Sequence, residues 1–287
     1  MSIVIGGKSY DIYKTRILEI DRIDYPFSSI EQIGLLTNLQ KLFLICNNYL
    51  KLPKDIGNLL KLKIAELQHN NFSILPVSIC NLSQLLILNL KGNQLINLPE
   101  NIGNLTQLKI LDLSNNYLID LPEDIGVLSQ LEILNVSSNK LIKLPETICA
   151  LSQLKYLYSG NNNLIELPEG IGALSQLKEL NLNNNNLIKL PKSIKNIREI
   201  VYLPICSYQI DNLDLECKFL IIDNLDKPLE NLPSNLKNIW LYNSNILLKK
   251  IKIPFNCNIY NYPSAKSNTC EDYTDKNFTY EEIMELI

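Results

Sequence analysis

The sequence contains a single histidine, His69, among its 287 residues. One imidazole excludes a multi-histidine metal site and leaves few ways to build a histidine-based catalytic centre. The sequence also lacks a P-loop, a dinucleotide fingerprint, a Ca²⁺-binding loop and a carboxylate cluster. We therefore expect no bound metal, no cofactor and no enzymatic activity.

The seven cysteines are an odd number and include no C-x-x-C pair. The opening residues, MSIVIGGKSYDIYK, show no cationic segment followed by a long apolar run, so we expect no signal peptide. No apolar run approaches the length of a membrane span. Reduced thiols are then the better interpretation, and they favour the cytoplasm, or the host cytoplasm for a viral protein.

Excess charge of either sign is also missing, because the formal net charge is −3. No stripe of lysine or arginine is evident along the sequence, which argues against nucleic acid and against a membrane surface as partners. The apolar content of 46% is enough for a substantial core. These properties predict a monomer whose partner, if it has one, is a protein.

The middle of the chain repeats itself every 23 residues. Proline, asparagine, leucine and isoleucine each keep this step in a column of their own. The proline column is Pro53, Pro76, Pro99, Pro122, Pro145, Pro168 and Pro191, and the asparagine column is Asn47, Asn70, Asn93, Asn116, Asn139, Asn162 and Asn185. A fixed period of this length indicates a solenoid, in which each unit buries its apolar face only against its neighbours.

The repeated unit predicts its own local structure. The alternation Leu111-x-Leu113 is typical of a strand with one face turned inward. Asn116 follows, and its side chain can both donate and accept hydrogen bonds, so stacked asparagines would form a ladder through the core. Pro122 cannot donate a backbone hydrogen bond and suits an outer arc. Strands on one side and bulkier arcs on the other predict a right-handed horseshoe with a parallel β-sheet on its concave face.

This unit, L-x-x-L-x-L-x-x-N-x-L-x-x-L-P-x-x-I-G-x-L, resembles the leucine-rich repeat family over about residues 39–205. The 23-residue form with LPxxIGxL is similar to the intracellular class of Ras-binding scaffolds, Scribble and Erbin, and to repeat proteins of amoebae, bacteria and giant viruses. The resemblance implies an α/β-type repeat solenoid whose convex arcs are mostly irregular or 3-10. It also implies a protein-binding scaffold without catalysis in the repeats.

The chain divides into four segments by pattern. Residues 1–38 form an N-terminal cap, with a hairpin around Gly6-Gly7, a strand at 16–21 and a degenerate repeat in which Ile30 replaces proline. Residues 39–205 are the regular repeats. Residues 206–262 contain three strands, at 218–223, 238–243 and 257–262, either as irregular repeats that cap the solenoid or as a separate small domain. Residues 263–287 are a tail in which Thr279 and Glu282 predict a short terminal helix.

Two cysteines allow catalytic alternatives. Cys46 and His69 stand in the same column of adjacent repeats, as a thiol and its base would, but nothing supplies a third, orienting group. The competing interpretation is two rim residues in a tolerant column. Cys270, in TCEDY, superficially resembles the nucleophile of bacterial leucine-rich-repeat ubiquitin ligases. About 25 residues follow Tyr262, too few to enclose such a site.

Side chains that alternate with the core leucines should face away from the core, on the concave side. They include four successive isoleucines, and an apolar ridge on an otherwise wet surface often marks binding, although isoleucine is also a common strand former. The predicted partner-binding residues are Phe43, Ile64, Glu66, Ile87, Ile110, Asp112, Ile133, Tyr156 and Tyr158. Glu66 and Asp112 favour a basic, partly apolar partner segment. We therefore expect a non-enzymatic protein-interaction module; a repeat protein without a fixed partner is the alternative.

Overall fold

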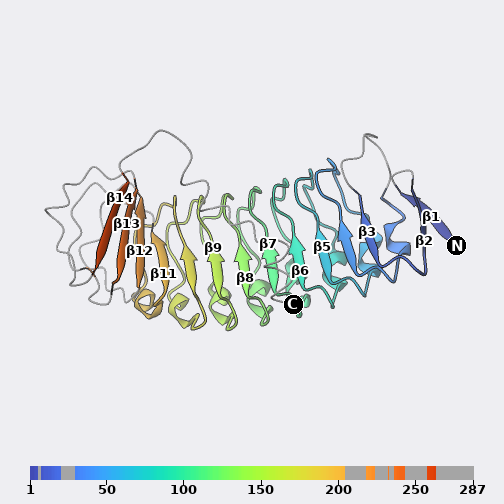
Figure 1. Cartoon of the computed structure of the whole chain (residues 1–287). Helices are drawn as coiled ribbons and strands as arrows, with labels where there is room; N and C mark the ends of the chain where they lie inside the picture. Colours follow the sequence, from blue (N-terminus) through green and yellow to red (C-terminus); the bar gives the residue numbers. More distant parts are fainter. Residues whose placement is uncertain are drawn as a thin grey trace.

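The computed structural model describes residues 1–5, 8–20, 30–203, 218–223, 232, 236–242 and 257–262. Within them, twelve parallel strands stand side by side in one row, from β3 (Ile17–Glu19) to β14 (Asn258–Tyr262) (Figure 1). A separate antiparallel pair, β1 (Ser2–Ile5) and β2 (Lys8–Asp11), lies at the N-terminal end of the row. The predicted solenoid with a parallel sheet is confirmed.

Each strand of the row pairs only with the strands of the preceding and the following repeat. The strands between the two ends are β4 (Lys41–Phe43), β5 (Ile64–Glu66), β6 (Ile87–Asn89), β7 (Ile110–Asp112), β8 (Ile133–Asn135), β9 (Tyr156–Tyr158), β10 (Glu179–Asn181), β11 (Ile200–Leu203), β12 (Phe219–Asp223) and β13 (Asn238–Tyr242). From β4 to β10 the strands pair without a register shift, so residues one repeat apart lie next to each other.

The convex side consists of short 3-10 helices, as the sequence predicts. They are η1 (Ile33–Leu35), η2 (Lys54–Asn58), η3 (Val77–Asn81), η4 (Glu100–Asn104), η5 (Glu123–Val127), η6 (Glu146–Ala150), η7 (Ile171–Ala173) and η8 (Lys192–Asn196). The column proline stands before the arc and its carbonyl accepts the first hydrogen bond, as from Ile125 N–H to Pro122 O at 3.0 Å. Ile30 takes this place before η1, and its carbonyl accepts from Ile33 N–H, also at 3.0 Å. The first hydrogen bond of the arc therefore requires a backbone carbonyl at this position and does not require the proline ring.

The asparagine column forms the predicted ladder. Asn116 Nδ2 donates to the carbonyls of Leu113, at 2.9 Å, and of Leu90 in the preceding repeat, at 3.0 Å. Its Oδ1 accepts from Leu95 N–H at 3.0 Å. The side chain is 4% exposed, so one buried amide satisfies backbone groups of two repeats at once. The same pattern recurs at Asn93, Asn139, Asn162 and Asn185.

The regular spacing ends one repeat before residue 205. Ile200, not Tyr202, pairs with Glu179, so the step from β10 to β11 shortens to 21 residues. The strands expected at 218–223, 238–243 and 257–262 are present as β12, β13 and β14 and extend the same sheet.

Several expectations fall outside the described residues. They are the Gly6-Gly7 turn between β1 and β2, the terminal helix with Thr279 and Glu282, and Cys270. The boundaries of the four segments stay predictions. In the described part of the chain no helix is long and apolar enough to cross a membrane.

Candidate partner-binding face

The sheet separates two apolar clusters. In β7 the middle residue, Leu111, is fully buried in the main core, whereas its neighbours Ile110 and Asp112 lie on the opposite, concave face. The strand period of two residues explains the division, because successive side chains point to opposite faces. The main core closes against the convex arcs. The second cluster therefore belongs to a surface that the solenoid does not need for its own core.

This second cluster is the predicted isoleucine ridge. Its members are Ile64, Ile87, Ile110, Ile133 and Tyr158, with Leu86 and Tyr156 packed at its margins. The strand register places the four isoleucines next to one another. They are only 1–4% exposed, so the expectation that the ridge lies open to water is wrong. A partner can therefore contact these isoleucines only if it displaces the atoms that cover them.

Partly exposed aromatic side chains mark the two ends of the ridge. Phe43 lies on β4 and Tyr156 on β9, and both are half-buried. The rings of Tyr156 and Tyr158 stack, with centroids 6.2 Å apart and an angle of 17° between their planes. Aromatic rings with one open face are frequent anchor points in protein interfaces.

A row of acidic and amide side chains runs beside the ridge, at the last residue of each strand from β5 to β8. Glu66 is 6% exposed, and Asn89 Nδ2 donates a 2.8 Å hydrogen bond to its Oε2. Burial raises the pKa of the Glu66 carboxyl; the hydrogen bond from Asn89 opposes this shift and the negative charge of Asp112 adds to it. Asp112 in turn accepts hydrogen bonds from the backbone N–H and the hydroxyl of Ser114, at 2.8 and 2.6 Å.

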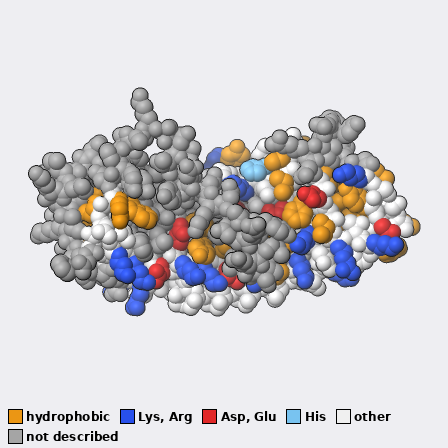
Figure 2. Space-filling model, viewed as in Figure 1, with side chains coloured by type: hydrophobic (Ala, Val, Ile, Leu, Met, Phe, Trp, Pro, Cys, Tyr) orange, Lys and Arg blue, Asp and Glu red, His pale blue; other side chains and the backbone are white. Residues whose placement is uncertain are grey.

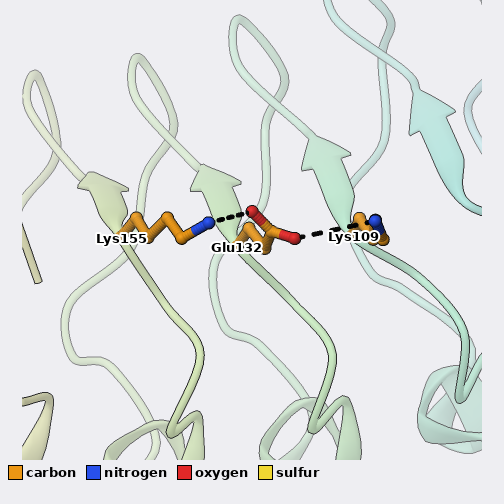
Figure 3. A network of polar contacts seen from close by, with 3 residues as sticks. All are labelled: Lys109, Glu132 and Lys155. Carbon is orange, nitrogen blue, oxygen red and sulfur yellow. Dashed lines mark hydrogen bonds and ion pairs between the residues drawn. The ribbon is translucent and has the colours of Figure 1, made fainter. Parts of the chain in front are cut away.

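Lysines line the other side of the ridge, one residue before each strand. Lys109 and Lys155 reach toward Glu132, which immediately precedes β8 in the repeat between them, with Nζ–O distances of 3.8 and 2.5 Å (Figure 3). The same row includes Lys218, whose Nζ lies 2.5 Å from Glu199 Oε1. Its lysines are Lys63, Lys109, Lys155, Lys178, Lys218 and Lys237, and we call them the lysine row. Figure 2 shows Lys and Arg side chains recurring along the lower half of this view.

Sequence reasoning missed the lysine row, and its expectation of no basic stripe is wrong. The lysines are a repeat or more apart in the sequence and never cluster in any short window. Leu86, Glu132 and Glu199 also interrupt the column. The 23-residue step that revealed the prolines, read one place before the ridge, gives Lys63, Lys109, Lys155 and Lys178, whereas Lys218 and Lys237 lie off this step.

The concave face also holds buried polar atoms without a hydrogen-bond partner. They are Gln68 Oε1, Ser137 Oγ, Asn181 Nδ2 and Asn183 Oδ1. A buried polar atom without a partner costs on the order of 1–3 kcal/mol, and native proteins keep few of them. These four atoms lie on β10 and in the turns that follow β5, β8 and β10; three more, Asn47 Oδ1, Tyr49 Oη and Asp55 Oδ1, lie elsewhere in the solenoid.

The Cys46–His69 pair has a conformational explanation. Both residues have positive φ, 58° and 57°, and so do their equivalents in the following repeats. A Cβ on Gly92, the next member of the column, would lie 2.6 Å from His69 Nδ1, so the imidazole leans over Gly92. The column is set by a left-handed turn rather than by a tolerant rim, and it explains these residues without a catalytic role. The column is Cys46, His69, Gly92, Asn115, Ser138, Asn161 and Asn184.

The remaining described thiols are not activated. Burial raises the pKa of Cys80 to about 11, and the pKa values of Cys149 and Cys257 are raised for the same reason. A reactive cysteine needs the opposite shift, because the thiolate is the nucleophile. All four described cysteines are free, and no group of three or more His, Cys, Asp or Glu residues in this part of the chain could hold a metal.

Solved structures share this fold at low sequence identity. An internalin, InlF from Listeria monocytogenes, is 19% identical over 87% of this chain and 67% of its own, with a TM-score of 0.62. The functional domain of InlJ from the same species, described as including a cysteine ladder, is 23% identical over 76% of this chain, with a TM-score of 0.58. The match spans 47% of InlJ, about half its length. At such identities the likeness concerns the fold alone.

A leucine-rich repeat protein of Leptospira interrogans is also 23% identical, over 87% of this chain and 96% of its own, with a TM-score of 0.46. A comparison with curated protein sequences returns no match. The family model of the leucine-rich repeat region matches residues 12–112 and 97–244, which together are most of the chain. With its repeat columns, asparagine ladder and parallel sheet, this chain belongs to the leucine-rich repeat family.

Proposed function

We propose that this protein is a non-enzymatic interaction module that binds a protein partner on the concave face of its sheet. The observation that carries the proposal is the second apolar cluster, which the sheet separates from the core. Folding needs the leucines on the core side, but it does not need five large apolar side chains on the other side. Binding by repeat solenoids on an extended concave surface is a general use of this architecture.

The surroundings of the cluster support the same proposal. Glu66 is held in a buried position that disfavours its charge, and such positions cost stability and concentrate at functional sites. The unpartnered polar atoms of Gln68, Ser137 and Asn183 lie in the row beyond it. A partner that supplies hydrogen bonds to these atoms removes their desolvation cost, so the face gains from being covered.

Cellular setting and oligomeric state belong to the proposal as well. The free thiols of Cys46, Cys80, Cys149 and Cys257 support a reducing compartment, and we propose a cytoplasmic monomer. Light scattering on purified protein tests the monomer, and fractionation of the expressing cell tests the compartment.

The experiment compares interface variants in affinity capture followed by mass spectrometry. Phe43→Ala together with Tyr156→Ala removes the half-buried aromatics at the two ends of the ridge. We expect at least about a ten-fold loss of the captured partner, since hot-spot truncations typically cost 2 kcal/mol or more. Ile110→Glu is the poorer choice, because Ile110 is 4% exposed and an unpaired buried carboxylate would also destabilise the fold.

The matched control is Glu123→Lys on the convex arc η5, where the side chain is exposed. Hydrogen exchange of the wild-type complex should show protection of β5 to β9. Capture that survives the double variant, together with protection only on the convex side, would contradict the concave-face assignment.

A further inference from the structure

We propose that residues 280–287 of this chain pack on the isoleucine ridge and cover the concave face until a partner displaces them. The contact within the chain stands on its own evidence, whereas its displacement by a partner rests on the proposed function. The segment makes the protein its own competitor, so that a partner binds more weakly than it would bind the uncovered face.

The burial of the ridge calls for a second layer on the concave side of the sheet. Ile87 and Ile133 are each 1% exposed, and Ile110 is 4% exposed. One face of a sheet is shielded from water when another layer of structure packs on it. In the described part of the chain, the apolar side chains packed with these isoleucines come from the strands themselves and from Leu86, next to β6. The rest of the cover therefore belongs to other residues of this chain.

Chain length limits which of the other residues reach the whole ridge, which runs from β5 to β8. The longest loops between β11 and β14 hold 15 residues, 204–218 and 243–257, and each returns to the sheet. Such a loop reaches at most about 25 Å from its strand. β5 stands six spacings from β11 and eight from β13, roughly 29 and 38 Å. These loops therefore fall short of Ile64, at the far end of the ridge.

The same limit applies at the N-terminal end. Residues 21–29 follow β3 and lead to Ile30, so their nine residues reach at most about 15 Å before they return. β8 stands five strand spacings from β3, roughly 24 Å away. This loop does not reach Ile133, at the other end of the ridge.

The residues after β14 are long enough. β14 ends at Tyr262, and β8 and β5 stand six and nine strand spacings from it, roughly 29 and 43 Å away. The 17 residues 263–279 extend to about 56 Å. No described strand follows β14, so this part of the chain is not required to return to the sheet. Residues 280–287 can therefore lie over every isoleucine of the ridge.

The sequence of this segment matches an apolar ridge. Tyr280, Ile283, Met284 and Ile287 stand at i, i+3, i+4 and i+7, which is the spacing of one face of an α-helix. The first and last of them lie about 10 Å apart along such a helix, or two strand spacings, so the stripe spans three neighbouring strands. Packed on the ridge, it removes two apolar surfaces from water at once. The acidic residues Glu281, Glu282 and Glu285 occupy the opposite side of the helix.

A photo-cross-link in the full chain tests the contact directly. Tyr280→p-benzoylphenylalanine places a light-activated group at the start of the stripe. We expect cross-links within one molecule to peptides that contain β5 to β8, mapped by mass spectrometry. Ile283→Gln with Met284→Gln should remove them, because the stripe loses its apolar character. Cross-links to the convex arcs, or between two molecules, would overturn the proposal.

The matched control changes the polar side of the same helix. Glu281→Gln with Glu285→Gln also places two glutamines in the segment, but it leaves the apolar stripe intact. The cross-links to β5 to β8 should persist in this variant. Their loss in both double variants alike would overturn the assignment of the stripe to the ridge.

A peptide supplied in solution measures the competition. The peptide FTYEEIMELI, residues 278–287, carries fluorescein and is followed by fluorescence polarisation. It should bind the full chain with Ile283→Gln and Met284→Gln at least about ten-fold more tightly than the wild type, in which the tethered segment already occupies the ridge. The same peptide with glutamine at these two positions should not bind. Equal affinity for the two chains, or none for either, would overturn the proposal.

Partner capture separates this inference from the proposed function. Ile283→Gln with Met284→Gln should raise the captured partner about ten-fold, and the control variant should not. If Tyr280 cross-links to β5 to β8 but capture depends neither on the segment nor on Phe43 and Tyr156, the segment covers the face and the proposed function fails. If capture depends on Phe43 and Tyr156 while Tyr280 cross-links elsewhere, the face binds partners and this inference fails.

Discussion

At the scale of single residues, the asparagine column makes the side-chain hydrogen bonds that join one repeat to the next. Asn116 has one donor group shared by Leu90, Leu113 and Ser114 carbonyls and one acceptor used by Leu95 N–H. Its neighbour Asn115 is exposed and contributes a positive φ of 55° instead. Two adjacent asparagines therefore have different roles, and the sequence alone predicts which is which from the 23-residue step.

Asn116→Ala should lower the free energy of unfolding by roughly 1–3 kcal/mol, because it leaves buried backbone groups without partners. Asn115→Gly is the matched control, and it should be neutral or slightly stabilising because glycine adopts positive φ without strain. Urea denaturation followed by circular dichroism measures both. Equal losses for the two variants would contradict the ladder.

The left-handed column supports a second residue-scale prediction. Gly92 has a φ of 65°, and a Cβ there would meet the His69 ring at 2.6 Å. Gly92→Ala should cost about 1–2 kcal/mol from backbone strain together with the collision. In a His69→Gly background the collision disappears, and the cost should fall to the strain alone. Thermal melts of the four proteins of this double-mutant cycle would refute the contact if the two costs were the same.

Glu66 makes stability depend on pH in a known direction. Its pKa is raised above the ordinary 4.5, so the folded state binds the proton more tightly than the unfolded state. The ionised carboxylate therefore destabilises the fold at neutral pH, and this penalty disappears as pH falls from above the raised pKa to about 4.5. Glu66→Gln should therefore raise the free energy of unfolding at pH 7 and change it little at pH 4. A gain that does not change with pH would show that charge is not the cause.

At the scale of elements, the glycine after the arc isoleucine sets how closely neighbouring 3-10 helices approach. A Cβ on Gly126 would lie 2.3 Å from the carbonyl oxygen of Thr147 on the next arc. Cys80 and Cys149 occupy the same column on η3 and η6, and these two arcs pack less closely on the arcs that follow them. A side chain in this column is therefore accommodated only where the arcs stand further apart.

Gly126→Ala should consequently lower the free energy of unfolding by about 1–3 kcal/mol, since it forces two backbones apart. Gly170→Ala is the control; Gly170 immediately precedes η7, two arcs further along, and the nearest atom to a new Cβ there is the Cys149 sulfur at 3.2 Å. It should cost clearly less, because a side chain can move where a carbonyl cannot. Chemical denaturation of both variants would contradict this account if Gly170→Ala were the more destabilising.

At the scale of the whole molecule, repetition explains what the sequence could predict. Each column is read seven times over, so the strands, the arcs and the asparagine ladder followed from pattern alone. The shelter of Ile87 and Ile110 could not be predicted, because exposure depends on what packs over a face and not on alternation. The lysine row was not predicted because its members are a repeat or more apart in the sequence and come together only in the folded solenoid. A repeated residue pattern therefore predicts the strands and arcs of each repeat, but it does not predict which side chains are exposed.

The stability of the regular repeats depends on the strands that follow them. β10 and β11 pair edge to edge, and Leu180 and Val201 are fully buried on the core side of that junction. A chain that ends at Glu199 would leave unpaired the backbone groups of β10 that face β11, and would uncover the core side of its repeat; such edges promote association. We expect it to melt at lower temperature and to form oligomers in light scattering, whereas a chain that begins at Thr15, without β1 and β2, should lose less. A monomeric, sharply melting protein ending at Glu199 would show that the strands from β11 to β14 do not cap the repeats.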